Sequence, residues 1–130
     1  MNEVYEFLKK CETYYLATVY ENKPKVRPFG TVNIFNDKLY IQTGKKKAVS
    51  RELHANANAE ICAFDGEKWL RLSGELVEDD DRAARKSMLD AYPDLRALYN
   101  EDDGNTEVFY FSNAEATLYS FTAAPRAIKF

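Results

Sequence analysis

Residues 38–53 read "KLYIQTGKKKAVSREL", a strand pattern followed by a glycine, three consecutive lysines and a helix pattern. The first six residues are rich in β-branched and aromatic side chains, as is typical of strands. Val49 and Leu53 are four residues apart and fall on one side of a short helix. The lysines therefore stand where a strand ends and a helix begins, a position whose free backbone N–H groups attract anions.

The lysine turn by itself supports two interpretations. An exposed run of like charges is often only a solvated turn. Alternatively, Thr43 offers a hydroxyl and Gly44 lets a ligand approach the backbone closely. Phosphate is the natural ligand of such a site, because each charge-assisted hydrogen bond to it contributes about 1.5–3 kcal/mol.

A second irregular stretch, "RPFG" at 27–30, interrupts the strand expected at 25–35. Pro28 cannot donate to a strand ladder and Gly30 packs poorly, so the stretch alone is often an edge-strand bulge. We expect strand 25–35 to pair with strand 38–43 through a tight turn. The two irregular stretches would then lie together, where a flat ligand with an anionic tail contacts both.

The rest of the chain predicts an α+β protein. Six or seven antiparallel strands with three or four short helices favour a small barrel, because so many strands must close or stack to protect their edges. The length of 130 residues fits a single domain, 1–130. The further strands are expected at 13–20, 59–64, 67–79, 107–112 and 115–122, and the further helices at 2–11, 81–92 and from Pro93.

The charge distribution favours a small anionic ligand over nucleic acid. The chain is acidic, with a pI near 5.3, but residues 1–51 carry ten Lys/Arg against five Asp/Glu. An acidic protein gains little from releasing the counterions of nucleic acid. No apolar run reaches membrane-spanning length and no signal peptide is evident, so we expect a cytoplasmic protein.

Several kinds of site are disfavoured by the sequence. Neither a dinucleotide nor a nucleoside-triphosphate fingerprint is present, and two cysteines without zinc spacing provide no metal site. His54, the only histidine, falls on the polar side of a helix and is expected to be solvated. The acidic clusters at 78–81 and 101–104 lack EF-hand spacing and are typical of solvated loops. We therefore expect no metal and name no catalytic acid or base.

The motifs "YYLATV", "LYIQTG", "LHANA", "WLRLSGELVED" and "YSFTAAPRAIKF" resemble the pyridoxamine 5′-phosphate oxidase-like FMN-binding proteins over nearly the whole chain. The resemblance implies a six-stranded antiparallel split β-barrel with short flanking helices. It also implies a homodimer with FMN at the subunit interface. The cofactor-binding residues expected from the pattern and the resemblance are Arg27, Pro28, Phe29, Gly30, Gln42, Thr43, Gly44, Lys45, Lys46, Lys47 and Trp69.

The resemblance also sets the expected function. The C-terminal extension that completes the vitamin-B6 pocket of true pyridoxamine phosphate oxidases is missing, so we do not expect the reaction that gives the family its name. We expect a flavin-dependent oxidoreductase, in which the flavin carries the chemistry for a small-molecule substrate and a nicotinamide donor. The alternatives are a non-catalytic module that stores or senses flavin or haem, and an interaction domain without a cofactor.

Overall fold

The structure, a computed structural model, describes all residues from 1 to 130. Three α-helices and a short 3₁₀ helix flank one antiparallel sheet of eight strands. None of the helices is long and apolar enough to cross a membrane. The helices are α1 (Asn2–Cys11), α2 (Ala48–Ala55), α3 (Arg82–Ala91) and the 3₁₀ helix η1 (Pro93–Ala97). The strands are β1 (Tyr14–Tyr20), β2 (Lys23–Phe29), β3 (Asn33–Phe35), β4 (Lys38–Gly44), β5 (Asn58–Phe64), β6 (Lys68–Glu78), β7 (Thr106–Ser120) and β8 (Arg126–Lys129).

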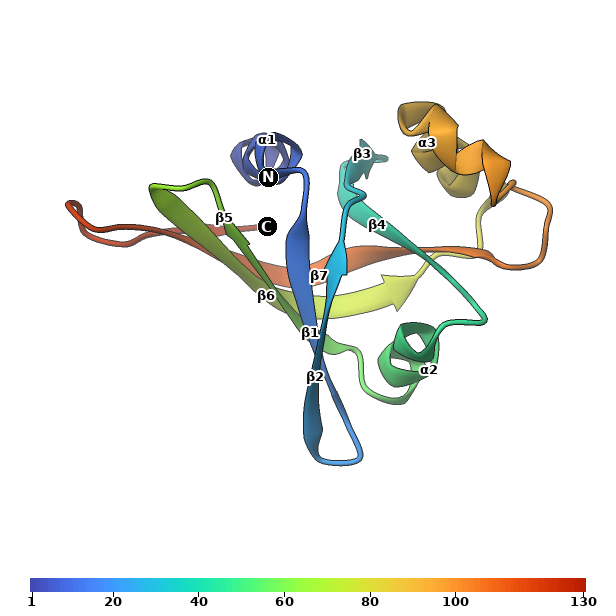
Figure 1. Cartoon of the computed structure of the whole chain (residues 1–130), viewed down its shortest axis with the longest axis horizontal. Helices are drawn as coiled ribbons and strands as arrows, with labels where there is room; N and C mark the ends of the chain where they lie inside the picture. Colours follow the sequence, from blue (N-terminus) through green and yellow to red (C-terminus); the bar gives the residue numbers. More distant parts are fainter.

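The sheet has the strand order β2-β1-β5-β6-β7-β4-β3, and β8 pairs with β7. The predicted α+β class and split-barrel fold are confirmed, but the sheet has eight strands rather than six. The sheet is open, because β2 and β3, at the two ends of this order, do not pair with each other. Figure 1 shows the hairpin of β1 and β2 crossing β6 and β7 at a steep angle.

The prediction of a single strand at 25–35 is wrong. Between Phe29 and Asn33 the chain passes from one edge of the sheet to the other. β2 pairs only with β1, and β3 pairs with β4. The predicted hairpin with strand 38–43 therefore holds for Asn33–Phe35 alone. Pro28 and Gly30 correctly predicted an interruption of the strand. The chain crosses there from one end of the sheet to the other.

The two closing strands expected at 107–112 and 115–122 form one continuous strand, β7. Asn113 adopts a left-handed φ of 52°, and the pairing with β6 shifts register between Ser73 and Glu75. A side chain on Gly74 would place its Cβ 3.0 Å from the carbonyl oxygen of Ser112, so this bulge requires a glycine for close approach. The break expected between the two strands is instead this bulge, and β8 was not predicted.

The end of β4 lies between two helical layers, and this arrangement positions the site. One face of the sheet packs against α1 and α2 in a core of 19 buried residues that includes Leu8, Val49 and Leu53. The other face packs Tyr40 and neighbouring side chains against Met88 of α3. Figure 1 shows α2 and α3 on either side of β4. Ligand-facing groups from both layers can therefore meet at this strand end.

Candidate functional site

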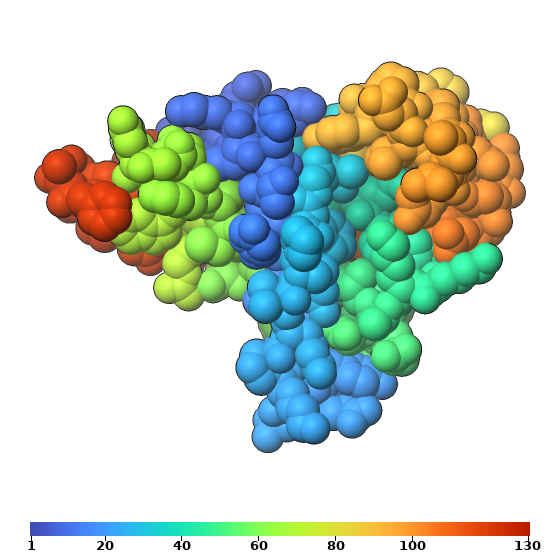
Figure 2. All heavy atoms as spheres, in the orientation of Figure 1, coloured from blue at the N-terminus to red at the C-terminus, as the bar shows by residue number.

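A pocket of about 370 Å³ opens at the end of β4, within the size range of small-molecule sites. Figure 2 shows the surface recessed where the light-blue segment after β2, the green start of α2 and the orange segment of η1 approach one another. Nine of its twelve lining residues come from the two stretches that the sequence singled out, 27–30 and 38–53. The lining residues are Arg27, Pro28, Phe29, Gly30, Thr31, Gln42, Thr43, Lys47, Ala48, Val49, Leu95 and Tyr99.

The segment after β2 reaches β4 through side-chain hydrogen bonds and not through strand pairing. The hydroxyl of Thr31 accepts a bond from the backbone N–H of Gln42 at 3.0 Å. The Tyr14 hydroxyl donates to the carbonyl of Thr31 at 2.6 Å, and Tyr92 bonds both backbone groups of Val32. Because β3 ends its pairing with β4 at Tyr40, the last residues of β4 have one edge at the pocket without a strand partner, where Thr31 bonds the Gln42 N–H.

Two buried polar atoms at the pocket have no hydrogen-bond partner. These atoms are Oε1 of Gln42, a residue 6% exposed, and Oγ1 of Thr43, a residue 4% exposed. Buried polar atoms are nearly always hydrogen-bonded, and an unsatisfied one costs about 1–3 kcal/mol. Both atoms belong to residues that line the pocket. Their unmet hydrogen-bonding capacity indicates a polar ligand.

Arg27 lines the pocket but is also a structural tie. Its guanidinium donates to the Leu16 carbonyl at 3.2 Å, to the Thr18 hydroxyl at 3.0 Å and to the carboxylate of Glu52. Burial acts to raise the pKa of Glu52, but the bonds from Thr18 and Arg27 hold that pKa below its ordinary value. The group therefore joins the β1–β2 hairpin to α2. Three of its five N–H donors are committed in this way, and two are free for a ligand.

The three lysines occupy different positions. Lys47 precedes α2 and lines the pocket. The backbone N–H groups of Lys45 and Lys46 donate to the main-chain and side-chain oxygens of Asn105, at 2.8 and 3.1 Å, and neither residue lines the pocket. The N–H groups of Ala48 and Val49 make no hydrogen bond within the chain, as is usual in a first helical turn. Lys47 and these two donors thus form the anion-attracting corner.

Gly44 also stands just outside the pocket, and its lack of a side chain has a different use from the one expected. An added Cβ would lie 3.1 Å from the amide of Asn105 and 3.3 Å from the ring of Tyr99. The glycine therefore makes room for the segment that carries Tyr99. It contributes to the pocket by letting this wall approach the end of β4.

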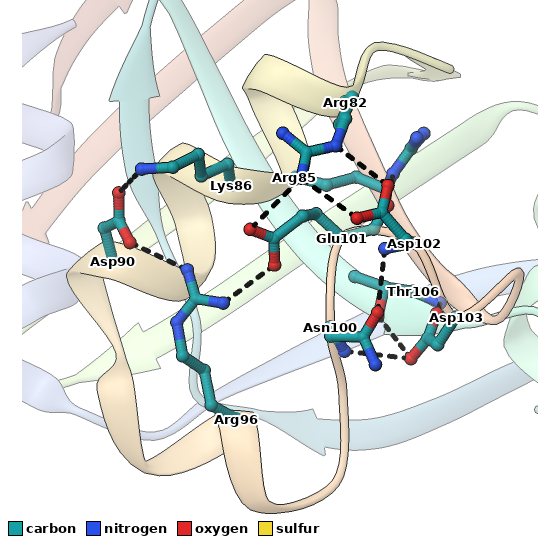
Figure 3. A network of polar contacts seen from close by, with 10 residues as sticks. All are labelled: Arg82, Arg85, Lys86, Asp90, Arg96, Asn100, Glu101, Asp102, Asp103 and Thr106. Carbon is teal, nitrogen blue, oxygen red and sulfur yellow. Dashed lines mark hydrogen bonds and ion pairs between the residues drawn. The ribbon is translucent and has the colours of Figure 1, made fainter.

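The wall that carries Leu95 and Tyr99 is held by an ion-pair network, shown in Figure 3. The acidic loop at 101–104, which was expected to be only solvated, lies at the centre of this network. Although burial acts to raise the pKa of Asp103, backbone N–H groups, led by that of Thr106, hold the pKa well below its ordinary value. The network fixes the position of Asn105, the partner of the lysine turn. Its ion pairs are Arg82–Glu101, Arg82–Asp102, Lys86–Asp90, Arg96–Asp90 and Arg96–Glu101.

Trp69 lies away from the pocket of its own chain. Its ring stacks on that of Tyr119, with centroids 5.2 Å apart and planes 7° from parallel, beside Phe121. The structure therefore brings together seven of the eleven expected residues. Those outside the pocket are Gly44, Lys45, Lys46 and Trp69.

Five lining residues were not expected from the sequence: Thr31, Ala48, Val49, Leu95 and Tyr99. Thr31 follows the irregular stretch directly, and Ala48 and Val49 begin the helix whose free N–H groups were already proposed to bind an anion. Proximity in sequence was therefore a usable signal for these three. Pro93 marked the turn that carries Leu95, but nothing in the pattern showed where that turn packs.

A second polar cluster lies outside the pocket, around His54, which was expected to be only solvated. Its Nε2 lies 2.8 Å from a carboxylate oxygen of Glu107 and 3.5 Å from one of Glu78. Burial and then the negative charge of Glu107 raise the pKa of Glu78. The histidine is half-exposed, but it is engaged with two carboxylates. No local pattern indicated this cluster, because its three residues come from separate elements.

Comparisons with known proteins agree with this architecture. A family model described as pyridoxamine 5′-phosphate oxidase matches residues 1–120. A NimC/NimA family protein from Clostridium acetobutylicum is 37% identical, with a TM-score of 0.97, over 100% of this chain and 92% of its own. No curated protein matches the sequence.

More distant solved structures share the fold. A pyridoxamine 5′-phosphate oxidase-related, FMN-binding protein from Nostoc punctiforme has 15% identity and a TM-score of 0.66, over 99% of this chain and 95% of its own. A haem-binding protein from Mycobacterium smegmatis has 15% identity and a TM-score of 0.67, over 95% of this chain and 57% of its own.

Proposed function

The chain belongs to the pyridoxamine 5′-phosphate oxidase family and to the NimC/NimA family, and on that premise we propose that it is an FMN-binding oxidoreductase. The observation that carries the proposal is the pair of unpartnered buried atoms, Gln42 Oε1 and Thr43 Oγ1, at a pocket with a cationic corner. A flavin offers N–H and hydroxyl donors to such atoms, and its phosphate suits Lys47. Both ends of the ligand thus find a counterpart.

Each part of the pocket has a role toward FMN. Lys47 and the free N–H groups of Ala48 and Val49 would bind the phosphate, because helix N-termini favour anions. Phe29 and Leu95 supply apolar surface for the flat ring. Bound FMN supplies hydride or electron transfer, while the protein orients it and excludes water.

No carboxylate, imidazole or thiol lines the pocket. Lys47 and Tyr99 are the only lining side chains of types that commonly act as acid or base, so the protein contributes mainly binding and orientation. This composition fits chemistry carried by the cofactor. A small-molecule substrate and a nicotinamide donor complete the proposed reaction.

Haem is the alternative cofactor, because a protein of similar fold binds it. Haem iron in proteins is held by His, Cys, Met or Tyr side chains. Among the lining residues only Tyr99 is of these types, and His54 lies outside the pocket. The pocket composition therefore favours flavin over haem.

The absorption spectrum of freshly purified protein tests the proposed cofactor. We expect flavin bands, and we expect them to bleach when NADH or NADPH is added without oxygen. A Soret band would instead indicate haem. Bound flavin that no donor reduces would indicate a storage or sensing module.

We further propose that the protein is a homodimer with the FMN site between subunits. Support comes from apolar side chains on the outward face of β1, β2 and β5, since large exposed apolar patches mark interfaces. Tyr15, Val26 and Phe64 are exposed there. Because Trp69 lies outside the pocket of its own chain, it would reach FMN only from the partner subunit. Sedimentation should show a dimer, and Val26→Asp should shift it toward a 15.0 kDa monomer.

We expect Gln42→Leu to stabilise the apoprotein while weakening FMN binding. The substitution removes a buried oxygen that has no partner, so the free energy of unfolding should rise by about 1 kcal/mol. The same change deletes a contact to the flavin, so affinity should fall roughly tenfold. Thermal unfolding and flavin titration measure the two effects. A loss of both stability and affinity would show that Gln42 is a structural residue.

A further inference from the structure

The side chains of His54, Glu78 and Glu107 converge at one point from three elements. His54 lies near the end of α2, Glu78 ends β6, and Glu107 is the second residue of β7. One potential ligand atom from each residue lies within 4.8 Å of the other two. The cluster shares no residue with the FMN pocket.

The burial of Glu107 sets this cluster apart from an ordinary surface ion pair. The residue is 1% exposed, and while one of its oxygens faces His54, Oε1 has no hydrogen-bond partner. A buried carboxylate with an unmet acceptor is costly unless a cation or donor completes it. The neighbouring Glu78 adds a second carboxylate, and both carboxylates approach the same nitrogen, Nε2 of His54. The site therefore holds more negative charge than one histidine can neutralise.

The donor set and spacing match a first-row divalent metal ion. Zinc binds imidazole nitrogen and carboxylate oxygen at about 2.0–2.2 Å, which places donors of a tetrahedral site roughly 3.3 Å apart. The histidine nitrogen lies 2.8 and 3.5 Å from the two carboxylates, on either side of that value. We propose that His54, Glu78 and Glu107 bind one divalent transition-metal ion, with Zn²⁺ the best match to one nitrogen and two carboxylate ligands.

Access to the site and its surroundings fit this proposal. Half of the His54 side chain is exposed, so an ion can enter from solvent. The ring of His54 packs against Phe109, with centroids 5.6 Å apart, which holds the imidazole in place over β7. Lys45 is the competing cation, but its Nζ is 3.9 Å from Glu78, beyond hydrogen-bond distance. A metal would displace this loose contact, and its bonds to His54 and Glu107 would replace the hydrogen bond between them.

Calorimetric titration of tag-free, chelator-treated protein with ZnCl₂ alone tests the proposal. We expect one Zn²⁺ per chain with a dissociation constant in the micromolar range or below. Thermal unfolding should shift upward with added Zn²⁺, because an ion that binds only the folded state stabilises it. Co²⁺ should give the visible absorption of a four-coordinate ion in the parent protein.

Ligand variants separate this site from incidental binding. Glu78→Gln and His54→Gln should each weaken Zn²⁺ binding more than tenfold, and Glu107→Gln should do the same if it folds. Glu60→Gln is the matched control, because Glu60 is an exposed carboxylate paired with Arg71 on the same sheet. The proposal is overturned if Zn²⁺ does not bind the parent protein. It is also overturned if Glu78→Gln and His54→Gln bind Zn²⁺ as tightly as the parent, since the thiols or other carboxylates would then be the ligands.

Discussion

Arg27→Ala should lower the free energy of unfolding by about 3 kcal/mol, the lower end of the cost of breaking a buried ion pair. The substitution leaves the carboxylate of Glu52, which is 4% exposed, without its cationic partner. It also removes a bond to the hydroxyl of Thr18. We expect the lower end of that cost because the side chain of Arg27 is 23% exposed and the pair is only partly buried. Urea denaturation of the apoprotein measures the effect.

Arg71→Ala is the matched control for this prediction. Arg71 pairs with Glu60 at 2.7 Å, but both side chains are largely exposed. Exposed pairs contribute about 0–1 kcal/mol, so the control should change stability little. If both variants lost the same stability, burial of Glu52 would not be the cause, and the tie between α2 and the hairpin would be an ordinary surface contact.

The difference between the parent protein and Arg27→Ala should also depend on pH. The pKa of Glu52 is held below its ordinary value of 4.5 in the folded state. A group with a depressed folded pKa stabilises the protein above its unfolded pKa, and this contribution is lost as pH falls through the folded pKa. Removing Arg27 leaves burial to raise the pKa of Glu52 in the folded variant. The difference should therefore be largest above this raised pKa, shrink as pH falls, and be lost below the depressed folded pKa of the parent.

The sequence predicted the local elements well where periodicity and turns agreed. Helix 2–11 matches α1, and the lysine turn does precede a helix, α2. The stretch 25–35 shows the limit of prediction from local sequence. Both of its halves are strands, but they pair with different partners. Pairing depends on how the sheet curls, which no local pattern encodes.

The site was predictable in its chemistry but not in its assembly. The irregular backbone at Pro28 and Gly30 and the lysine turn were correctly expected to meet, although strand pairing was the wrong reason. Nothing local to Arg27 showed that its guanidinium is shared with Glu52, because the two residues lie 25 positions apart. Contacts of this kind, like the cluster at His54, arise only once separate elements pack.

The three lysines are chemically alike, but only Lys47 lines the pocket. Substitution of Lys47 is therefore the second change with a large expected effect. We expect Lys47→Gln to weaken FMN binding roughly 10- to 100-fold, the loss that follows from removing one charge-assisted hydrogen bond. Riboflavin, which lacks the phosphate, should bind the variant as it binds the parent. Titration of both ligands, followed by flavin fluorescence, measures the difference.

Lys46→Gln is the matched control for Lys47→Gln, since the side chain of Lys46 is exposed, makes no ion pair and lies outside the pocket. Both variants remove one charge from the same turn, so a long-range effect of net charge would weaken FMN binding equally in the two. Only Lys47 adjoins the free N–H groups of Ala48 and Val49, so only its loss should remove a local contact. Equal losses for Lys46 and Lys47, or an equal loss of riboflavin, would place the phosphate elsewhere. The two uncommitted N–H donors of Arg27 would then be the next group to test.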